Sequence, residues 1–224
     1  MLACVAAERT EDAHSERVLK SRREAGPRGT RAIEALLEAA LAEFGARGWR
    51  DTTVENVLRA AGVSRATFYR YFADLRDVLH VLARRYIDEV TPIMEKLYAQ
   101  ALSDSDLRDT AVDEYVSIYS RYSGIARIWA EEAPQDRTLM LMARRSSEWP
   151  RRSFRATFPA HAELDADATF LVIYALTDRF PYHAFGTGSP RQGVVDRDAV
   201  AATIKVMLDG VARAHQLLAS RESS

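Results

Sequence analysis

Apolar residues along the chain recur mainly at intervals of three and four, which is the period of an amphipathic α-helix. The first such stripe comprises Ile33, Leu36, Leu37, Ala40 and Phe44. Thr30 is positioned to cap this helix, and Gly45 and Gly48 are expected to end it. The sequence has no alternating apolar and polar run bounded by hairpin turns, and no internal repeat. The pattern predicts an all-α fold.

Two short helices are predicted next, separated by a tight turn. Thr52 opens a T-x-x-E capping box with Glu55, so the first is expected to start there. Gly62 stands where a helix C-terminus favours positive φ, and Ser64 caps the next helix immediately. The core-facing residues are Val54, Val57, Leu58 and Ala61 in the first helix and Phe68 and Phe72 in the second. This order is typical of a helix-turn-helix.

The rest of the sequence predicts longer helices. From Asp74 onward, helical spacing is sustained past Pro92, which either kinks one long helix or begins a new helix capped by Thr91. Further helices are expected near 106–122, 124–132, 136–157, 165–183 and 197–219. We therefore divide the chain into a mobile basic arm (1–27), a three-helix helix-turn-helix domain (28–76) and a larger helical domain (77–224), with a long helix joining the two domains.

Charge adds a candidate partner. The formal net charge is −1, yet residues 17–72 hold 11 Lys and Arg against six Asp and Glu, so the remainder is acidic. A basic head on an acidic body is expected when one part of a molecule meets a polyanion. Ordinary arginine-rich composition is the alternative.

Composition also excludes several classes. The longest apolar run, 170–176, is far shorter than a membrane span, so no membrane partner is expected. The start of the chain lacks the basic region of a signal peptide. Cys4 is the single cysteine and the histidines are scattered, so neither a disulfide, a metal site nor a cofactor is expected. A reducing cytoplasm is the expected location. The sequence has no phosphate-binding glycine loop and no nucleophile elbow, so we expect no enzyme.

One motif combines A-G-V-S at 61–64 with T-F-Y-R-Y-F at 67–72. With the rest of residues 33–49 and 52–74, it resembles the DNA-binding domain of TetR-family transcriptional regulators. The resemblance covers roughly residues 30–80. Two positions depart from the family, which usually has a small residue where Leu58 stands and a lysine where Leu75 stands. The second departure removes a family phosphate contact that Arg76 is placed to replace in part.

The predicted DNA-contacting residues lie on or near the second short helix. Arg65 projects from its first turn and suits guanine, although a phosphate contact is the alternative. The hydroxyls of Thr67, Tyr69 and Tyr71 suit phosphates, a use that the resemblance implies for the two tyrosines, with plain packing the alternative for Tyr71. The remaining members of the set are Thr53, Ser64, Arg70, Arg28 and Arg31. The arm arginines Arg22, Arg23, Arg28 and Arg31 either reach a minor groove or are merely solvated.

The resemblance also implies a ligand cavity and a dimer interface in the larger domain. The candidate ligand-binding residues are Tyr119, Tyr122, Trp129, Trp149, Phe170, Tyr174 and His183, with plain core packing the alternative. The last two helices are expected to pair with those of a second copy. The candidate stripe is Val200, Ile204, Met207, Leu208 and Val211, with burial inside the monomer the alternative.

Together these features predict a homodimeric, ligand-responsive regulator. We expect a repressor that a small apolar or amphipathic effector releases from a pseudo-palindromic double-stranded DNA operator. A ligand-insensitive or architectural DNA-binding dimer is the main alternative, and an enzyme a remote one.

Overall fold

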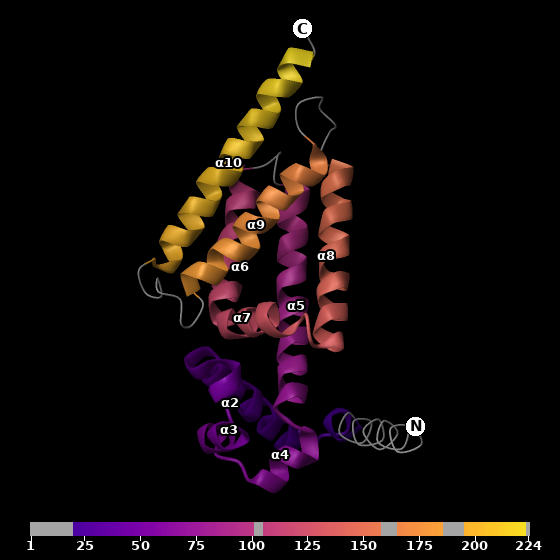
Figure 1. Cartoon of the computed structure of the whole chain (residues 1–224), viewed down its shortest axis with the longest axis vertical. Coiled ribbons are helices and arrows are strands. Elements are labelled where there is room, and N and C mark those ends of the chain that lie inside the picture. Colours follow the sequence, from indigo (N-terminus) through magenta and orange to yellow (C-terminus); the bar gives the residue numbers. More distant parts are fainter. Residues whose placement is uncertain (1–19, 101–104, 158–164, 186–194, 223–224) are drawn as a thin grey trace. The chain divides into compact units, whose positions relative to one another are not determined.

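Helices account for all regular structure in the computed structural model, which describes residues 20–100, 105–157, 165–185 and 195–222. In chain order they are α2 (Pro27–Asp51), α3 (Val54–Ala61), α4 (Arg65–Tyr71), α5 (Leu75–Gln100), α6 (Ser105–Arg121), α7 (Ser123–Glu132), α8 (Arg137–Thr157), α9 (Ala166–Phe185) and α10 (Arg197–Glu222), as Figure 1 shows. A helical turn, residues 20–23, precedes α2. The all-α prediction is confirmed. The chain divides into two compact units, residues 1–82 and 83–224, and the boundary lies inside α5.

In the first unit, helices α2 to α4 and the start of α5 share one core. Its fully buried side chains include Leu36, Leu37, Phe44, Val57, Phe68, Phe72 and Leu79. The rings of Phe68 and Phe72 are 5.8 Å apart, and burial of each such ring stabilises the fold by about 1.5–3 kcal/mol. The core therefore anchors α4 by one face, as predicted from its two phenylalanines.

The ends of α2 differ from the sequence prediction. The helix begins at Pro27 after Gly26, because proline at the first helical position loses no hydrogen bond. The prediction that Thr30 caps it is wrong: the Thr30 hydroxyl lies within the helix and donates to the carbonyl of Gly26 at 3.3 Å. Gly45 remains helical, and the helix is interrupted only at Gly48, whose φ is 76°.

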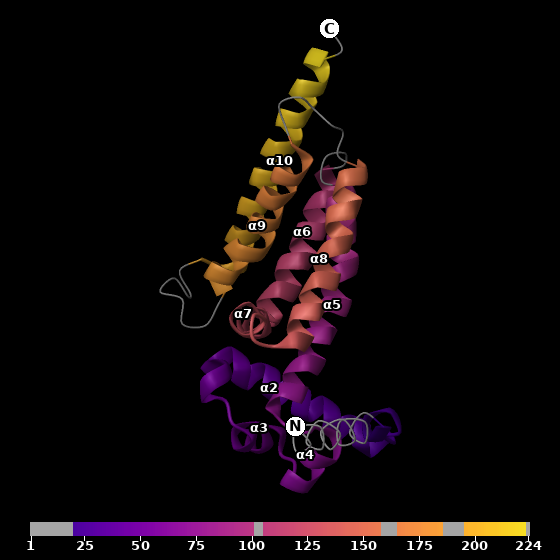
Figure 2. The ribbon, with the colours of Figure 1, turned by 45° about the vertical axis from the view of Figure 1, so that its right-hand side comes forward.

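In the second unit, α6 packs against α9 and α10, and α8 packs against α9. Helices α9 and α10 run side by side in two views (Figures 1 and 2). The shared core includes Leu97, Tyr98, Val112, Val116, Tyr119, Phe154, Ile173, Val200, Ile204 and Leu208. The predicted helices of this half agree with α6 to α10 to within three residues at each end.

Helix α5 continues through Pro92, so the alternative in which a new helix starts at this residue is wrong. Proline lacks the amide hydrogen that would bond the carbonyl of Asp88, four residues earlier. Apolar residues on both sides of Pro92, among them Val90, Ile93 and Leu97, are buried in the core of the second unit. Their burial compensates for the missing bond, and one helix persists.

Candidate functional site

Specific caps fix the turn between α3 and α4. Helix α3 starts one residue later than predicted, because Thr53 forms a reciprocal capping box with Asn56. The predicted box of Thr52 with Glu55 is wrong: Thr52 is buried, and its hydroxyl donates to the carbonyl of Gly48 at 2.6 Å. Gly62 ends α3 in the left-handed region with φ 65°, as predicted.

Ser64 caps α4, as predicted, by accepting a hydrogen bond from the Thr67 amide at 3.1 Å. The turn thus comprises only residues 62–64. Because caps and the aromatic core hold both helices, the first turn of α4 is presented on a rigid support.

The outer face of α4 is polar and basic. Arg65, Ala66, Tyr69 and Arg70 are exposed, whereas Phe68 is fully buried behind them. Arg65 pairs with Glu55 in the first turn of α3. Both side chains are more than half exposed, and exposed pairs contribute about 0–1 kcal/mol. A stronger anionic partner can therefore displace Glu55 from the guanidinium at little cost.

Several predicted contact residues have structural tasks. The Thr53 hydroxyl belongs to the capping box, and the hydroxyls of Ser64 and Thr67 lie 2.9 Å apart in a mutual hydrogen bond. Tyr71 is only 8% exposed, and its hydroxyl lies over Gly29 in the first turn of α2. A Cβ atom at Gly29 would be 2.5 Å from that oxygen. Tyr71 therefore ties α4 to α2, as the packing alternative expected, and phosphate contacts by these four hydroxyls stay predictions.

The first turn of α2 adds positive charge beside α4. Arg28 and Arg31 are exposed, and this turn contains no acidic residue. The partial positive charge of a helix N-terminus adds to these cations. Helices α2 and α4 are in contact. Arg28 and Arg31 on α2, with Arg65 and Arg70 on α4, therefore place cationic groups on two neighbouring helices.

Arg22 does not extend into solvent as an arm residue would. Its side chain is 13% exposed, and the guanidinium donates to Asp77 Oδ1 at 3.0 Å and lies 5.0 Å from the ring centre of Phe72. The other oxygen of Asp77 accepts the Ala73 amide at 3.1 Å. The expected groove contact of Arg22 is wrong, because burial and the ion pair occupy its guanidinium. Arg23 is exposed, and residues 1–19 of the predicted arm lie outside the described residues.

Arg76, expected to replace a phosphate-binding lysine, is exposed and lies 5.4 Å from the ring centre of Trp49. This contact places the guanidinium over Trp49 near the end of α2. A phosphate contact by Arg76 stays a prediction.

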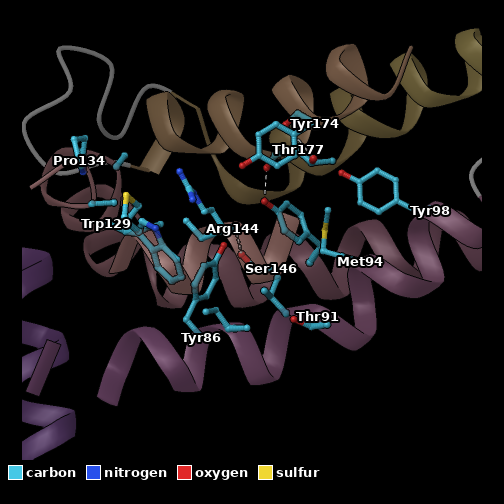
Figure 3. Close-up of a pocket in the computed structure, with 18 residues that line it drawn as sticks. Tyr86, Thr91, Met94, Tyr98, Trp129, Pro134, Arg144, Ser146, Tyr174 and Thr177 are labelled. Carbon is cyan, nitrogen blue, oxygen red and sulfur yellow. Dashed lines mark hydrogen bonds between the residues drawn. The ribbon is translucent and has the colours of Figure 1, made fainter. Parts of the chain in front are cut away.

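The second unit contains a partly open cavity of about 500 Å³ (Figure 3). Helices α5 to α9 all contribute to its wall. The larger lining residues are Tyr86, Met94, Tyr98, Tyr115, Trp129, Met140, Arg144 and Tyr174. This size and the predominance of aromatic and apolar side chains are typical of sites for small organic molecules.

Two of the predicted ligand-binding residues, Trp129 and Tyr174, line this cavity. Tyr119, Tyr122 and Phe170 are buried behind the wall, because their rings pack against those of Tyr86 and Tyr98. These three therefore do not line the cavity, as the core-packing alternative expected, and His183 is exposed outside the wall. Ligand binding by these four residues stays a prediction. The side chain of Trp149 lies outside the described residues.

Sequence reasoning missed the contribution of α5 to the wall. Tyr86, Val90 and Met94 follow at four-residue intervals and share one face, which is indistinguishable in sequence from an ordinary core stripe. A smaller hollow of about 350 Å³ adjoins the cavity, sharing Ile87, Thr91 and Ser146 with it, and carries the charged residues Arg84 and Asp88.

A hydrogen bond joins the cavity wall to α9. Pro181 lies inside α9 and has no amide hydrogen for the carbonyl of Thr177, four residues earlier. The Tyr115 hydroxyl, from α6, donates to this carbonyl instead. A cavity residue thus completes the bonding of a helix that proline would otherwise leave incomplete.

Residues from α8 and α9 also form an ion-pair clasp. Hydrogen bonds from Arg155, and then from Arg151, hold the pKa of the Asp167 carboxyl below its usual range. The same partner raises the pKa of Arg155. The clasp joins the two helices that carry Arg144 and Tyr174 of the cavity wall.

The predicted dimer stripe faces inward. Val200, Ile204 and Leu208 are fully buried inside the monomer, against α6 and α9, so the prediction is wrong for them. Val211 is partly buried against the same core. Met207 is 49% exposed, and the outer surfaces of α9 and α10 bear further exposed apolar side chains: Leu171, Val172, Val206 and Leu217. We call this set, with Met207, the outer apolar face.

Among the residues that the structure describes, no helix is both long and apolar enough to span a lipid bilayer. No cluster of three or more His, Cys, Asp or Glu in the same residues could hold a metal ion.

Part of the first unit is similar to a known protein family. Residues 36–82 match the family model of bacterial regulatory proteins, tetR family. No relative was found among curated protein sequences.

Solved structures resemble the chain over most of its length. A transcriptional regulator from Rhodococcus sp. Rha1 is 16% identical, with 83% of this chain and 96% of that one covered and a TM-score of 0.61. The TetR family transcriptional regulator PfmR from Thermus thermophilus is 14% identical, with 77% and 96% covered and a TM-score of 0.60. A TerR/AcrR family regulator from Aquifex aeolicus VF5 is 14% identical, with 80% and 99% covered and a TM-score of 0.59. At these identities the structures establish a shared fold.

Proposed function

We propose that this chain is a transcriptional regulator of the tetR family with an N-terminal DNA-binding domain, since residues 36–82 match the model of that family. It is a homodimer that releases a pseudo-palindromic operator when a small molecule occupies its cavity. Repression is the mode that release by an effector implies. The family is regulatory and not a family of enzymes.

The exposed first turn of α4 carries this proposal. A recognition helix must present its N-terminal residues to base edges while neighbouring groups hold phosphates. Arg65 lies at that turn, and its exposed partner Glu55 is easily displaced. Tyr69 and Arg70 on α4, with Arg28 and Arg31 on α2, supply candidate phosphate contacts around it.

The outer apolar face supports pairing with a second copy. Leu171 and Val172 on α9, and Val206 and Met207 on α10, expose apolar side chains on neighbouring helices. Burial of this surface against its own symmetry mate removes it from water on both subunits. A two-fold dimer then reads two half-sites about 34–36 Å apart, or a multiple of that distance.

Release by a ligand requires that the ligand bind one conformer more tightly than another. Helix α5 supplies Tyr86, Val90 and Met94 to the cavity wall, and the same helix begins at Leu75 in the first unit. Of the described elements, α5 alone belongs to both units. We therefore assign it the coupling between cavity and DNA-binding domain.

The test begins by selecting an operator from random duplex DNA with the full-length protein and measuring binding by fluorescence anisotropy. Arg65→Ala should lose about 1–3 kcal/mol of operator-binding free energy and relax the preference at one base pair per half-site. Tyr69→Phe should instead weaken binding to all DNA sequences alike. Arg197→Ala, at an exposed arginine of α10, is the charge-matched control and should leave affinity unchanged. Identical sequence profiles for wild type and Arg65→Ala would refute base reading, and the absence of any selected sequence would refute the proposed function.

A further inference from the structure

Arg65 differs from the other arginines of the first unit that are candidates for DNA contact. Its guanidinium Nη2 donates to Glu55 Oε1 in the first turn of α3, so the ion pair crosses the turn between the two helices. Arg28, Arg31 and Arg70 are also exposed, and among the residues that the structure describes no carboxylate pairs with them. Arg65 is therefore restrained in a way that the other three are not.

Both members of this ion pair lie on capped helices. Glu55 is in the first turn of α3, which the capping box of Thr53 closes. Arg65 is the first residue of α4, which Ser64 caps. Glu55 pairs across the turn although Arg59 follows it four residues later, at the spacing of an ordinary helical ion pair. The side chains of Arg65 and Glu55 are 59% and 53% exposed, so the guanidinium stays accessible to DNA while the carboxylate holds it.

The donors of arginine allow Glu55 to stay bound while a base is read. A guanidinium has five N–H donors, and a bidentate contact with guanine O6 and N7 uses two of them. The bond to Glu55 comes from Nη2 alone, so enough donors remain for the guanine. Holding a long side chain in place before DNA arrives also reduces the conformational entropy that base reading must overcome.

A phosphate is a different partner, because its charge has the same sign as that of Glu55. If the guanidinium turns to a phosphate while the ion pair persists, two anions lie close together. If the ion pair breaks, the carboxylate loses its cation beside a polyanion. Breaking an exposed pair costs little by itself, but the uncompensated carboxylate is then repelled by the phosphates around it. Guanine O6 and N7 are neutral acceptors and cause no such repulsion.

We propose that Glu55 is a positioning residue for base reading: it holds the guanidinium of Arg65 ready for a guanine edge and penalises its use on a phosphate. The carboxylate thereby lowers the affinity for unrelated DNA more than the affinity for the operator. This inference rests on the proposed function, since it concerns how the same helix distinguishes an operator from other DNA.

The test measures binding of the full-length protein to three duplexes by fluorescence anisotropy at one salt concentration, because affinity for DNA depends on salt. The first duplex is the operator selected from random DNA. The second is the same operator with the base pair that Arg65→Ala relaxes exchanged in both half-sites, and the third is a scrambled duplex of the same length. The specificity ratio is the affinity for the operator divided by the affinity for the scrambled duplex.

Glu55→Gln should raise the affinity for the scrambled duplex by about 3- to 10-fold, because the repulsion from phosphates is lost. On the operator, the lost repulsion and the lost preorganisation offset each other, so the affinity there should change by less than about 2-fold. The specificity ratio should therefore fall several-fold. The preference for the operator over the exchanged duplex should fall with it.

Further variants separate this ion pair from negative charge in general. Asp51→Asn removes an exposed acid at the end of α2, close in sequence to α3, and should leave the specificity ratio unchanged. Glu55→Asp keeps the charge on a shorter side chain and should give an intermediate ratio. In the Arg65→Ala background, Glu55→Gln should leave the sequence profile unchanged, because no guanidinium remains to be held. Circular dichroism of each variant reports that it remains folded.

Each contrary result overturns the inference. A specificity ratio that Glu55→Gln leaves unchanged, an equal fall in Asp51→Asn, or a fall that persists without Arg65 would show that the ion pair does not direct base reading. A changed preference at a different base pair would show that Glu55 reads a base itself. If Arg65→Ala relaxes no base pair, the inference fails together with base reading by Arg65. In all these cases a selected operator leaves the DNA-binding function intact, whereas the absence of any selected operator means that the proposed function itself fails.

Discussion

Gly29→Ala tests the packing of Tyr71 between α2 and α4 most directly. The new Cβ would lie 2.5 Å from the Tyr71 hydroxyl, 3.2 Å from its ring carbon Cζ and 3.1 Å from the Ala25 Cβ. Because Tyr71 is 8% exposed, its hydroxyl cannot simply rotate into water. Overpacking of this kind costs about 1–3 kcal/mol, while the gain in helix propensity offsets up to about 1 kcal/mol. We expect a net loss of about 0–2 kcal/mol in the free energy of unfolding.

The matched control is Gly45→Ala in the same helix, where the new Cβ has no atom within 4 Å. It should gain up to about 1 kcal/mol from propensity alone, so the two alanine variants should differ by about 1–3 kcal/mol. Urea unfolding monitored by circular dichroism measures both. Adding Tyr71→Phe should reduce the penalty at Gly29, because it removes the oxygen that clashes.

Displacement of Tyr71 also has a functional consequence. Since this residue ends α4, Gly29→Ala should weaken operator binding, whereas Gly45→Ala should not. If Gly29→Ala is as stable as Gly45→Ala, or if Tyr71→Phe fails to suppress its penalty, the contact between α2 and α4 is not as described.

Four further predictions address other contacts. Met207 is 49% exposed in the monomer, and Met207→Glu places a charge in the outer apolar face. Because pairing would bury two like charges, the variant should sediment as a folded monomer at micromolar concentration. A variant that stays dimeric would exclude this face as the dimer interface. Arg22→Ala removes the bond to Asp77 and the contact with Phe72 and should lower unfolding free energy by about 2 kcal/mol, whereas the exposed neighbour variant Arg23→Ala should be neutral in the same urea titration. Tyr115→Phe leaves the Thr177 carbonyl without its donor and should cost about 1–3 kcal/mol in thermal unfolding; an unchanged stability would mean that this bond is unimportant. The pKa of Asp167 is lowered in the folded state. The ion-pair clasp therefore contributes its full stabilisation of the fold above about pH 4, and this contribution is lost as the pH falls through the lowered pKa. Asp167→Asn should make stability depend less on pH in the acid range, and an unchanged acid dependence would contradict the clasp.

The helices and the helix-turn-helix were determined by local sequence. Gly62 and Ser64 predict the turn correctly, because positive φ and side-chain capping are properties of single residues and their immediate neighbours. Phe68 and Phe72 predict the buried side of α4 for the same reason of short-range spacing. The family resemblance in residues 61–72 coincides with a region in which local signals agree with one another.

Contacts between distant residues decided the rest. Both sides of α10 carry apolar residues, so spacing alone could not show that Val200 and Ile204 face α6 while Val206 and Met207 face outward. Nor could it distinguish Tyr86, in the cavity wall, from Tyr119, one layer behind it. The position of Arg22 against Asp77, 55 residues away, depends on how α5 packs. Periodicity identifies which residues share a face of one helix, but only the packing of helices determines what that face meets.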